Sequence, residues 1–373
     1  MCTERTNPIA RLSVLTSCFF IVSASMSAHA GGPYSVIDLG DLPGGLSVSQ
    51  AFGLSENGYV AGTSIAGTGG RGFIWDSVNG MRDLGDLPGG TNQSRAFRVN
   101  AHGQVVGDSV SSVGQQPFIW DSVNGMQNLG GLPGGTGVGF GTGINDLGYA
   151  VGASSVALSS SHAFLWVPGT AMIDIGATFP GCIQSFPTDI NKNISVVGSC
   201  STANGVRAFV WSFTEGVQLL GGLPGGNGYS SALAMNDVGQ VVGVSNTANG
   251  NRAFIWDQAH GMNMLPILPG GTGENQATGV NNLGQVVGLS SSGVSQPFLW
   301  ERETGMRSLN DLLLPAFANW NITEAWSIND RGWIAGTGIS PTGQRHAVLL
   351  TPEPASIAML MTMAVVAFRR RRV

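Results

Sequence analysis

Residues 223–256 read LPGGNGYSSALAMNDVGQVVGVSNTANGNRAFIW and contain three short patterns that return along the chain. These patterns are a Leu-Pro-Gly-Gly turn, an Asn-x-x-Gly turn followed by Val-x-Gly, and a Phe-x-Trp strand. The tryptophan of the third pattern recurs at intervals of 44–46 residues, at Trp75, Trp120, Trp166, Trp211, Trp256 and Trp300. A nearly constant period of this length indicates one structural unit repeated along the chain.

The other two patterns keep the same period and the same order. Leu-Pro-Gly-Gly begins at Leu42, Leu87, Leu132, Leu223 and Leu268, with a degenerate copy at Phe179. The Asn turn begins at Asn100, Asn145, Asn191, Asn236, Asn281 and Asn329, and in altered form at Ser55. The chain is therefore one unit written seven times.

Each unit has room for four short strands, which we call a to d. Examples are residues 232–235 for strand a, 240–242 for strand b, 253–256 for strand c and 80–84 for strand d. Strands b and c are apolar on consecutive residues, so both of their faces are expected to be buried. A four-stranded sheet buried on both faces must lie between two similar sheets, which is the arrangement of blades in a propeller.

The two ends of the repeat region complement each other. Residues 38–45 repeat residues 83–90 letter for letter, so the chain begins with a strand d that has no strands a to c before it. Residues 346–350 align with strand c at residues 162–166, and the tail begins where a strand d should follow. We therefore predict an all-β fold over residues 31–350, a seven-bladed β-propeller of four-stranded antiparallel blades. Pairing residues 34–39 with the last strand c would close the ring and hide its free edges.

Composition supports this architecture and excludes some partners. Glycine contributes 57 of 373 residues, and charged residues make up only 10%, where about 25% is usual. Lys192 is the only lysine, and the net charge is −5. The chain thus lacks a basic surface for nucleic acid, and no motif for a cofactor is present.

The N-terminal segment is typical of an export signal. Arg5 and Arg11 precede an apolar stretch at residues 12–22, and Ala28-His29-Ala30 follows as a cleavage motif. This order predicts a signal peptide over residues 1–30 that is cut after Ala30. A lipoprotein box ending at Cys18 is the alternative, but it would leave a very short apolar region.

The C-terminal segment, residues 351–373, has three parts in order. Pro352, Glu353 and Pro354 precede an apolar stretch at residues 355–368, which is followed by Arg369, Arg370, Arg371 and Arg372. A helix of that length spans about 21 Å, less than the ~30 Å hydrocarbon core of a membrane, and the arginines place its end in the cytoplasm. The segment resembles the PEP-CTERM sorting signal of Gram-negative bacteria. The resemblance implies a transient membrane tether recognised by an exosortase, in bacteria that export polysaccharide; a permanent C-terminal membrane anchor is the alternative.

The repeat itself resembles the HAF-repeat extracellular proteins over nearly all of residues 34–350. The resemblance is carried by Ser161-His162-Ala163-Phe164, by related stretches such as Arg207-Ala208-Phe209 and Arg252-Ala253-Phe254, and by the two turn patterns. It implies secretion and a repeated architecture, and it brings no catalytic residues.

Two cysteines remain after removal of the signal peptide. Cys182 and Cys200 are each nine residues from Asn191, so the a–b hairpin of the fourth unit would place them opposite each other, within reach of a disulfide. A disulfide is expected in an exported protein, with two free thiols as the alternative.

One polar position recurs two residues before the centre of strand c. Its occupants are Arg71, Gln116, His162, Arg207, Arg252, Gln296 and His346. Strand c begins on the face that carries the Leu-Pro-Gly-Gly loops, so these side chains could form a rim ring that contacts an acidic or hydroxyl-rich ligand such as a glycan. The alternative is that each bonds the backbone or a loop of a neighbouring blade, because repeated residues usually serve the repeat.

The aromatic and ionisable residues show no catalytic arrangement. The repeated tryptophans are expected to pack between blades, whereas Trp320, Trp326 and Trp333 lie outside the series and are candidates for exposed aromatics. Strand a lines the axis with small residues, apart from the charged Arg98 and Asp189. Repeated aspartates at turns are expected to form local hydrogen bonds. We assign no metal to them and leave calcium binding open.

These observations predict an exported, monomeric binding or structural module at the cell surface or in the extracellular matrix. A polysaccharide ligand and exosortase processing are the expected partners, and we expect no enzymatic activity. The alternative is a propeller enzyme, a glycoside hydrolase or lyase that acts on exported polysaccharide. A hydrolase would need two carboxylates about 5–10 Å apart in an open pocket.

Overall fold

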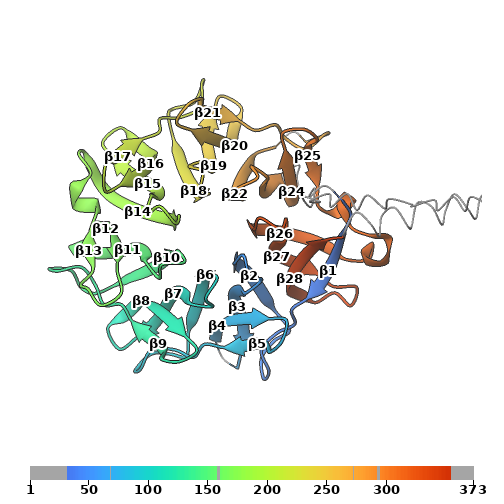
Figure 1. Cartoon of the computed structure of the whole chain (residues 1–373), viewed down its shortest axis with the longest axis horizontal. Coiled ribbons are helices and arrows are strands. Elements are labelled where there is room, and N and C mark those ends of the chain that lie inside the picture. The colour runs from blue at the N-terminus through green and yellow to red at the C-terminus, as the bar shows by residue number, and fades with distance from the viewer. Residues whose placement is uncertain (1–31, 68, 158–159, 272, 292–294, 354–373) are drawn as a thin grey trace, which may run out of the picture.

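Seven four-stranded sheets surround a central axis in the computed structural model, which describes residues 32–67, 69–157, 160–271, 273–291 and 295–353 (Figure 1). Neighbouring strands in each sheet are antiparallel. The predicted seven-bladed β-propeller is confirmed. The signal peptide expected at residues 1–30 lies outside the described residues, as do residues 354–373 of the expected tail. Within the described part of the chain, no helix is long and apolar enough to cross a membrane.

The first three blades follow the chain, and in each the strands run from the axis outward (Figure 1). Blade 1 contains β2 (Ser49–Leu54), β3 (Val60–Ala66), β4 (Gly69–Asp76) and β5 (Gly80–Asp83). Blade 2 contains β6 (Ser94–Val99), β7 (Val105–Ser111), β8 (Gly114–Asp121) and β9 (Gly125–Asn128). Blade 3 contains β10 (Gly139–Ile144), β11 (Ala150–Ala157), β12 (Ser160–Trp166) and β13 (Ile173–Asp174).

Blades 4 to 6 repeat the same order. Blade 4 contains β14 (Cys182–Ile190), β15 (Val196–Thr202), β16 (Gly205–Ser212) and β17 (Gly216–Leu219). Blade 5 contains β18 (Ser230–Met235), β19 (Val241–Thr247), β20 (Gly250–Asp257) and β21 (Gly261–Met264). Blade 6 contains β22 (Asn275–Val280), β23 (Val286–Ser291), β24 (Ser295–Glu301) and β25 (Gly305–Ser308).

Blade 7 combines the two ends of the chain, as the repeat count requires. Its strands are β26 (Asn321–Ile328), β27 (Ile334–Ile339), β28 (Arg345–Pro352) and, outermost, β1 (Tyr34–Asp38). β1 pairs with β28 over its whole length, from Tyr34 opposite Pro352 to Asp38 opposite Val348. β28 therefore continues two residues into the segment that we assigned to the sorting tail.

The connections between blades include three short 3-10 helices. η1 (Gly176–Thr178) precedes blade 4, and η2 (Asn310–Leu312) and η3 (Pro315–Phe317) form the insertion before blade 7. The insertion touches the closing strand, because the N–H of Leu314 donates to the carbonyl of Tyr34 at 2.9 Å.

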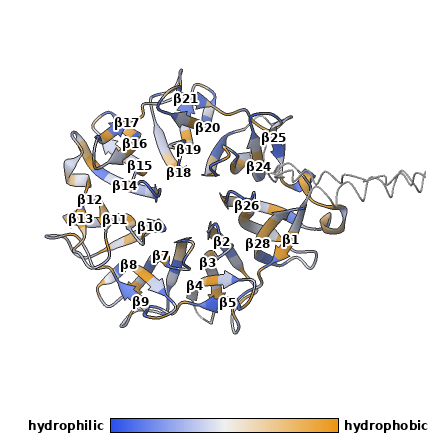
Figure 2. Cartoon of the chain, viewed as in Figure 1, coloured by the Kyte–Doolittle hydropathy of each residue, from blue (hydrophilic) through white to orange (hydrophobic). Residues whose placement is uncertain are grey.

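The hydrophobic core is divided among the gaps between blades. Buried apolar side chains of the described residues form seven clusters, and each cluster combines two adjacent blades. The repeated phenylalanines are fully buried in these clusters: Phe73, Phe118, Phe164, Phe209, Phe254 and Phe298. The repeated tryptophans pack at the cluster edges, where Trp211 is 5% exposed and Trp75 is half-buried. Figure 2 shows the same division, with hydrophobic residues in β4 and β8 and hydrophilic residues in the outer strands β5, β9 and β25.

Both turn patterns have a direct structural cause. In the Asn turn, the side-chain oxygen of Asn100 accepts the N–H groups of His102 and Gln104, each at 3.0 Å, so asparagine is favoured there over apolar residues. In the Leu-Pro-Gly-Gly turn, Leu87 is buried and donates its N–H to the hydroxyl of Ser109 at 2.9 Å. The second glycine leaves no room for a side chain, because a Cβ on Gly90 would lie 1.9 Å from the carbonyl oxygen of Val110.

Candidate functional site

The axis of the ring is lined by one irregular position in each innermost strand. The pairing register of strands a and b shifts at this point in every blade, because a bulge inserts one extra residue. The extra residues are Phe52, Phe97, Thr142, Thr188, Leu233, Thr278 and Trp326. All seven line one cavity of about 260 Å³ on the axis, together with Arg98. We call this cavity the aromatic recess.

The wall of the aromatic recess has two different halves. Phe52 lies between the other two aromatic rings, with its centroid 5.9 Å from that of Trp326 and 6.0 Å from that of Phe97. These three rings come from blades 7, 1 and 2. On the other side, the hydroxyls of Thr142, Thr188 and Thr278 donate to carbonyls of the next blade at 2.7–3.1 Å. The threonine hydroxyls are thus occupied, and the lining of the recess is largely apolar.

Two charged side chains follow the bulge, as the sequence placed them. The equivalent position elsewhere is held by Gly53, Gly143, Ala234, Gly279 and Ser327. A small residue suits this position because a Cβ on Gly53 would lie 2.7 Å from the carbonyl oxygen of Phe97 in the next blade. In blades 2 and 4, however, Arg98 and Asp189 extend into the channel.

Arg98 and Asp189 are held by backbone groups rather than by each other. Nη1 of Arg98 donates to the carbonyls of Phe52 and Phe97, both at 3.3 Å. The Asp189 carboxylate accepts the N–H groups of Ile190 and Met235, both at 3.0 Å. Burial raises the pKa of Asp189, and the positive charge of Arg98 opposes that rise.

A second cavity of about 200 Å³ lies on the axis at the end that carries the a–b turns. The turn asparagines surround it, and the side-chain amide of each donates to the backbone carbonyl that begins the next blade's turn. These bonds measure 2.9–3.2 Å and run from Asn100, Asn145, Asn191, Asn236, Asn281 and Asn329. Ser55 occupies the seventh position, and its shorter side chain accepts the N–H of Tyr59 instead. We call these six residues the asparagine ring.

Carboxylates of the same turns also bond from blade to blade. Asp146, Asp237 and Asp330 accept the backbone N–H groups of Ala101, Lys192 and Asn282 at 2.8–3.0 Å. Glu56 accepts the N–H of Asp330 at 3.1 Å, and burial raises its pKa. The expectation of local hydrogen bonds was wrong for these residues, although it holds for Asp38 and Asp83, which accept the N–H groups of Gly40 and Gly85. Within the described ranges, His, Cys, Asp and Glu form no group of three or more that suits a metal ion.

The rim ring predicted from strand c is engaged mainly within its own blades. Arg71 pairs with Asp83 and Asp86, His162 with Asp174, and His346 with Asp38. Gln116 accepts the amide of Asn128 at 2.7 Å. In all four cases the partner lies on, or just after, the outer strand of the same blade. The alternative that we weighed, bonds to a neighbouring blade, applies only to a 3.5 Å contact from Gln116 to Gly137.

The remaining rim residues lack an acidic partner on the outer strand. Arg207 donates to the carbonyls of Asn204 and Val206, and Arg252 to that of Asn251. Gln296 is half-buried opposite Ser290. The seven residues therefore occupy equivalent places but do not converge on a shared pocket of the described chain.

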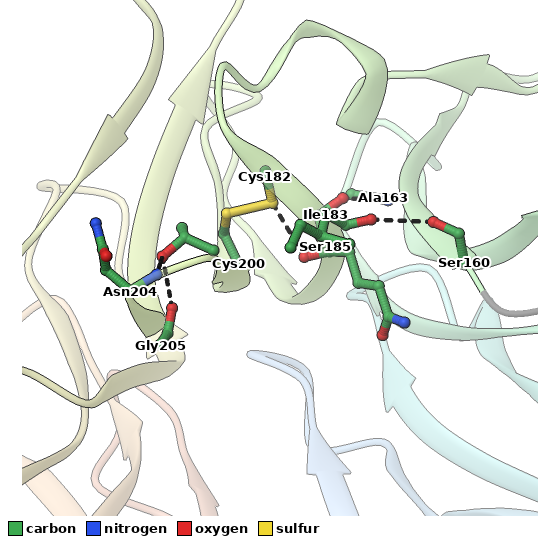
Figure 3. Close-up of a disulfide and its surroundings, with 10 residues drawn as sticks. Ser160, Ala163, Cys182, Ile183, Ser185, Cys200, Asn204 and Gly205 are labelled. Atoms are coloured by element: carbon green, nitrogen blue, oxygen red, sulfur yellow. Dashed lines mark hydrogen bonds between the residues drawn. A yellow bond between two sulfur atoms is a disulfide. The ribbon is translucent and has the colours of Figure 1, made fainter.

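The predicted disulfide is present between Cys182 and Cys200 (Figure 3). Their Cα atoms are 5.7 Å apart, but the two residues are not directly opposite. Cys182 faces Thr202, and Cys200 faces Ser185, because two bulges in β14 shift the register. Bonds from blade 3 fix the same segment, since the N–H of Ala163 donates to the Ser185 hydroxyl at 2.8 Å. The disulfide thus lies beside the contact between blades 3 and 4.

The three tryptophans outside the repeat have separate positions. Trp320 packs against the cluster between blades 6 and 7. Trp333 packs near Gly58 and under the guanidinium of Arg331, which is 5.4 Å from its ring centroid. Trp326 alone enters the aromatic recess, and all three are half-buried rather than exposed.

The fold and its channel define the class: the protein is a seven-bladed β-propeller with a lined axial channel. No protein-family description matches the sequence, and no curated protein does. Three solved structures are similar. A gluconolactonase from Xanthomonas campestris matches over 89% of this chain and 93% of its own, with 10% identity and a TM-score of 0.44. A puromycin-hydrolysing peptidase from Mycobacterium tuberculosis matches over 86% and 54%, with 12% identity and a TM-score of 0.49.

The third structure is the AofleA protein of Arthrobotrys oligospora. It matches over 76% of this chain and 94% of its own, with 14% identity and a TM-score of 0.40. Identities this low concern the fold alone and transfer no activity to this chain.

Proposed function

We propose that the protein is an exported β-propeller that serves as a binding or structural module at the cell surface or in the extracellular matrix. The observation that carries this proposal is the use of the repeated polar side chains. The asparagine ring, the turn carboxylates and most rim residues bond from strand to strand or from blade to blade, which favours a rigid ring. The disulfide supports an oxidising compartment, where such bonds persist.

The finer parts of this proposal rest on sequence resemblance. The order of parts at residues 1–30 supports export, and the order at residues 351–373 supports sorting by an exosortase from a transient membrane tether. The similarity to HAF-repeat proteins supports an extracellular location. Because bacteria with such tails export polysaccharide, we propose exopolysaccharide as the associated polymer and a monomer as the working form.

The test is a binding screen of the mature, disulfide-bonded protein. We expect retention on the producer's own exopolysaccharide and signals on a glycan array, both lost when the protein is reduced and unfolded. Equal retention of the folded and unfolded protein would show that the propeller is not the binding element. Failure to bind any polymer or array glycan would overturn the polysaccharide association and leave only a structural role.

The enzymatic alternative has one specific observation in its favour. Glu56 and Asp330 lie in contact around the cavity of about 200 Å³, and the raised pKa of Glu56 suits a general acid. Against this, both carboxylates take part in the blade-to-blade bonds described above. A glycoside hydrolase would release reducing ends from the polysaccharide, and Glu56→Gln would abolish the release. Our proposal expects no release from the wild-type protein.

A further inference from the structure

We propose that the aromatic recess binds a small organic carboxylate with a flat, apolar ring. The ring would lie among Phe52, Phe97 and Trp326, and the carboxylate would bind the guanidinium of Arg98. This inference concerns the channel and is independent of polymer binding, so either proposal can fail without the other.

The apolar part of the ligand follows from the shape and lining of the recess. Three aromatic side chains from three blades stand about 6 Å apart in tilted and edge-on orientations, the geometry in which aromatic groups attract one another. Benzene fills a cavity of about 150 Å³, so a volume of about 260 Å³ admits a substituted ring. A sugar fits this lining poorly, because the three threonine hydroxyls already donate to backbone carbonyls.

The charged part of the ligand follows from the state of Arg98. Its neighbours Arg95 and Arg345 form ion pairs, with Asp108 at 3.1 Å and Glu324 at 2.7 Å. Arg98 lines both axial cavities, and in the described chain its printed bonds are the two from Nη1 to carbonyl oxygens. Those bonds fix the guanidinium plane and leave Nε and Nη2 to donate. A guanidinium held in one plane is suited to a carboxylate, which accepts two parallel hydrogen bonds.

Asp189 limits how tightly an anion binds and supplies a second test. Its carboxylate lines the adjoining cavity and acts electrostatically on Arg98. Two backbone N–H groups hold it in place, so it does not turn away when an anion enters. Removal of this charge should strengthen the binding of an anion and leave a neutral ligand unaffected.

The experiment compares phenylacetate with phenylacetamide on the mature full-length protein, by calorimetry and by ligand-observed NMR. The two probes share the ring and differ in charge. We expect phenylacetate to bind at least ten-fold more tightly, and Arg98→Gln to abolish that difference. Asp189→Asn should improve phenylacetate binding several-fold without changing phenylacetamide binding. Trp326→Leu should weaken both probes.

Arg71→Gln is the matched control, because it removes an arginine from the rim and leaves the channel intact; it should bind both probes like the wild type. Equal affinity of the acid and the amide for the wild-type protein would overturn the proposal, and that comparison does not depend on any variant folding. Unchanged acid binding in Arg98→Gln, or weaker acid binding in Asp189→Asn, would also overturn it.

Discussion

His346 and Asp38 are separated by 308 residues, yet Nδ1 of His346 lies 3.0 Å from both carboxylate oxygens of Asp38. His162 and Asp174 form the same pair in blade 3, 12 residues apart, at 3.0–3.1 Å. The closing blade therefore reproduces the internal contacts of an ordinary blade. The two ends of the chain are joined by the same chemistry that holds each sheet together.

Closure by β1 predicts that the N-terminal strand stabilises the whole ring. Deletion of residues 34–42 removes β1 and exposes the edge of β28, so we expect a large fall in the midpoint of thermal unfolding and a loss of cooperativity. Circular dichroism and calorimetry measure both quantities. An unchanged unfolding midpoint would contradict closure.

The ion pair at the closure is a milder test of the same contact. Asp38→Asn removes the charge opposite His346, whose side chain is only 8% exposed, and should cost about 1 kcal/mol in the free energy of unfolding. Asp174→Asn is the matched control within blade 3. We expect similar costs in urea unfolding, but faster hydrogen exchange of β1 and β28 only for Asp38→Asn.

The asparagine ring predicts one destabilising and one stabilising substitution. Asn236→Ala removes the 2.9 Å bond to the carbonyl of Asn281 and an acceptor for the N–H of Gln240, at a cost of about 1–3 kcal/mol. Ser55→Asn should supply the missing seventh amide and stabilise the protein by about 0.5–1.5 kcal/mol. Urea unfolding measures both effects. No gain from Ser55→Asn would show that the blade 1 to blade 2 contact is already satisfied.

The disulfide closes a sequence separation of 18 residues, so its removal should cost up to about 3 kcal/mol by the chain-entropy estimate. Cys182→Ser with Cys200→Ser tests this by thermal unfolding, and the wild-type protein under reducing conditions is the control. Two free thiols in the denatured, unreduced wild-type protein would mean that the bond does not form.

Asp189 predicts a specific pH dependence of stability. Its pKa is raised in the folded protein, so between the unfolded and folded pKa values the folded state binds more protons. The free energy of unfolding contributed by this group therefore falls as pH rises through that window and is lower above it. The difference in stability between the wild type and Asp189→Asn should shift with pH in this sense, as measured by urea unfolding at several pH values. A difference that is constant with pH would refute the assignment.

The fold was readable from sequence because each repeat pattern has one structural cause. The Asn turn reports the Asx geometry seen at Asn100, and the second glycine of Leu-Pro-Gly-Gly reports the close approach at Gly90. The match between the residues around Asp38 and those around Asp83 was enough to predict the closure.

The site was only partly readable. Arg98 and Asp189 stood out as charges on the axis, but a bulge leaves no mark in the sequence, so the ring that includes Phe52 and Trp326 was missed. The rim residues were overinterpreted, although a signal was available: Arg71 and His162 each precede an aspartate by 12 residues, Asp83 and Asp174. Bonds between blades, such as Asn282 to Asp330, require three-dimensional coordinates.

The bulge gives each blade a single residue that meets no regular strand partner and takes no part in packing between sheets. That position already holds phenylalanine, threonine, leucine or tryptophan. Seven independent choices are thus available at the axis, and changing any of them leaves the scaffold in place. Such a protein can acquire a new chemical preference through single substitutions, without first having to be rebuilt.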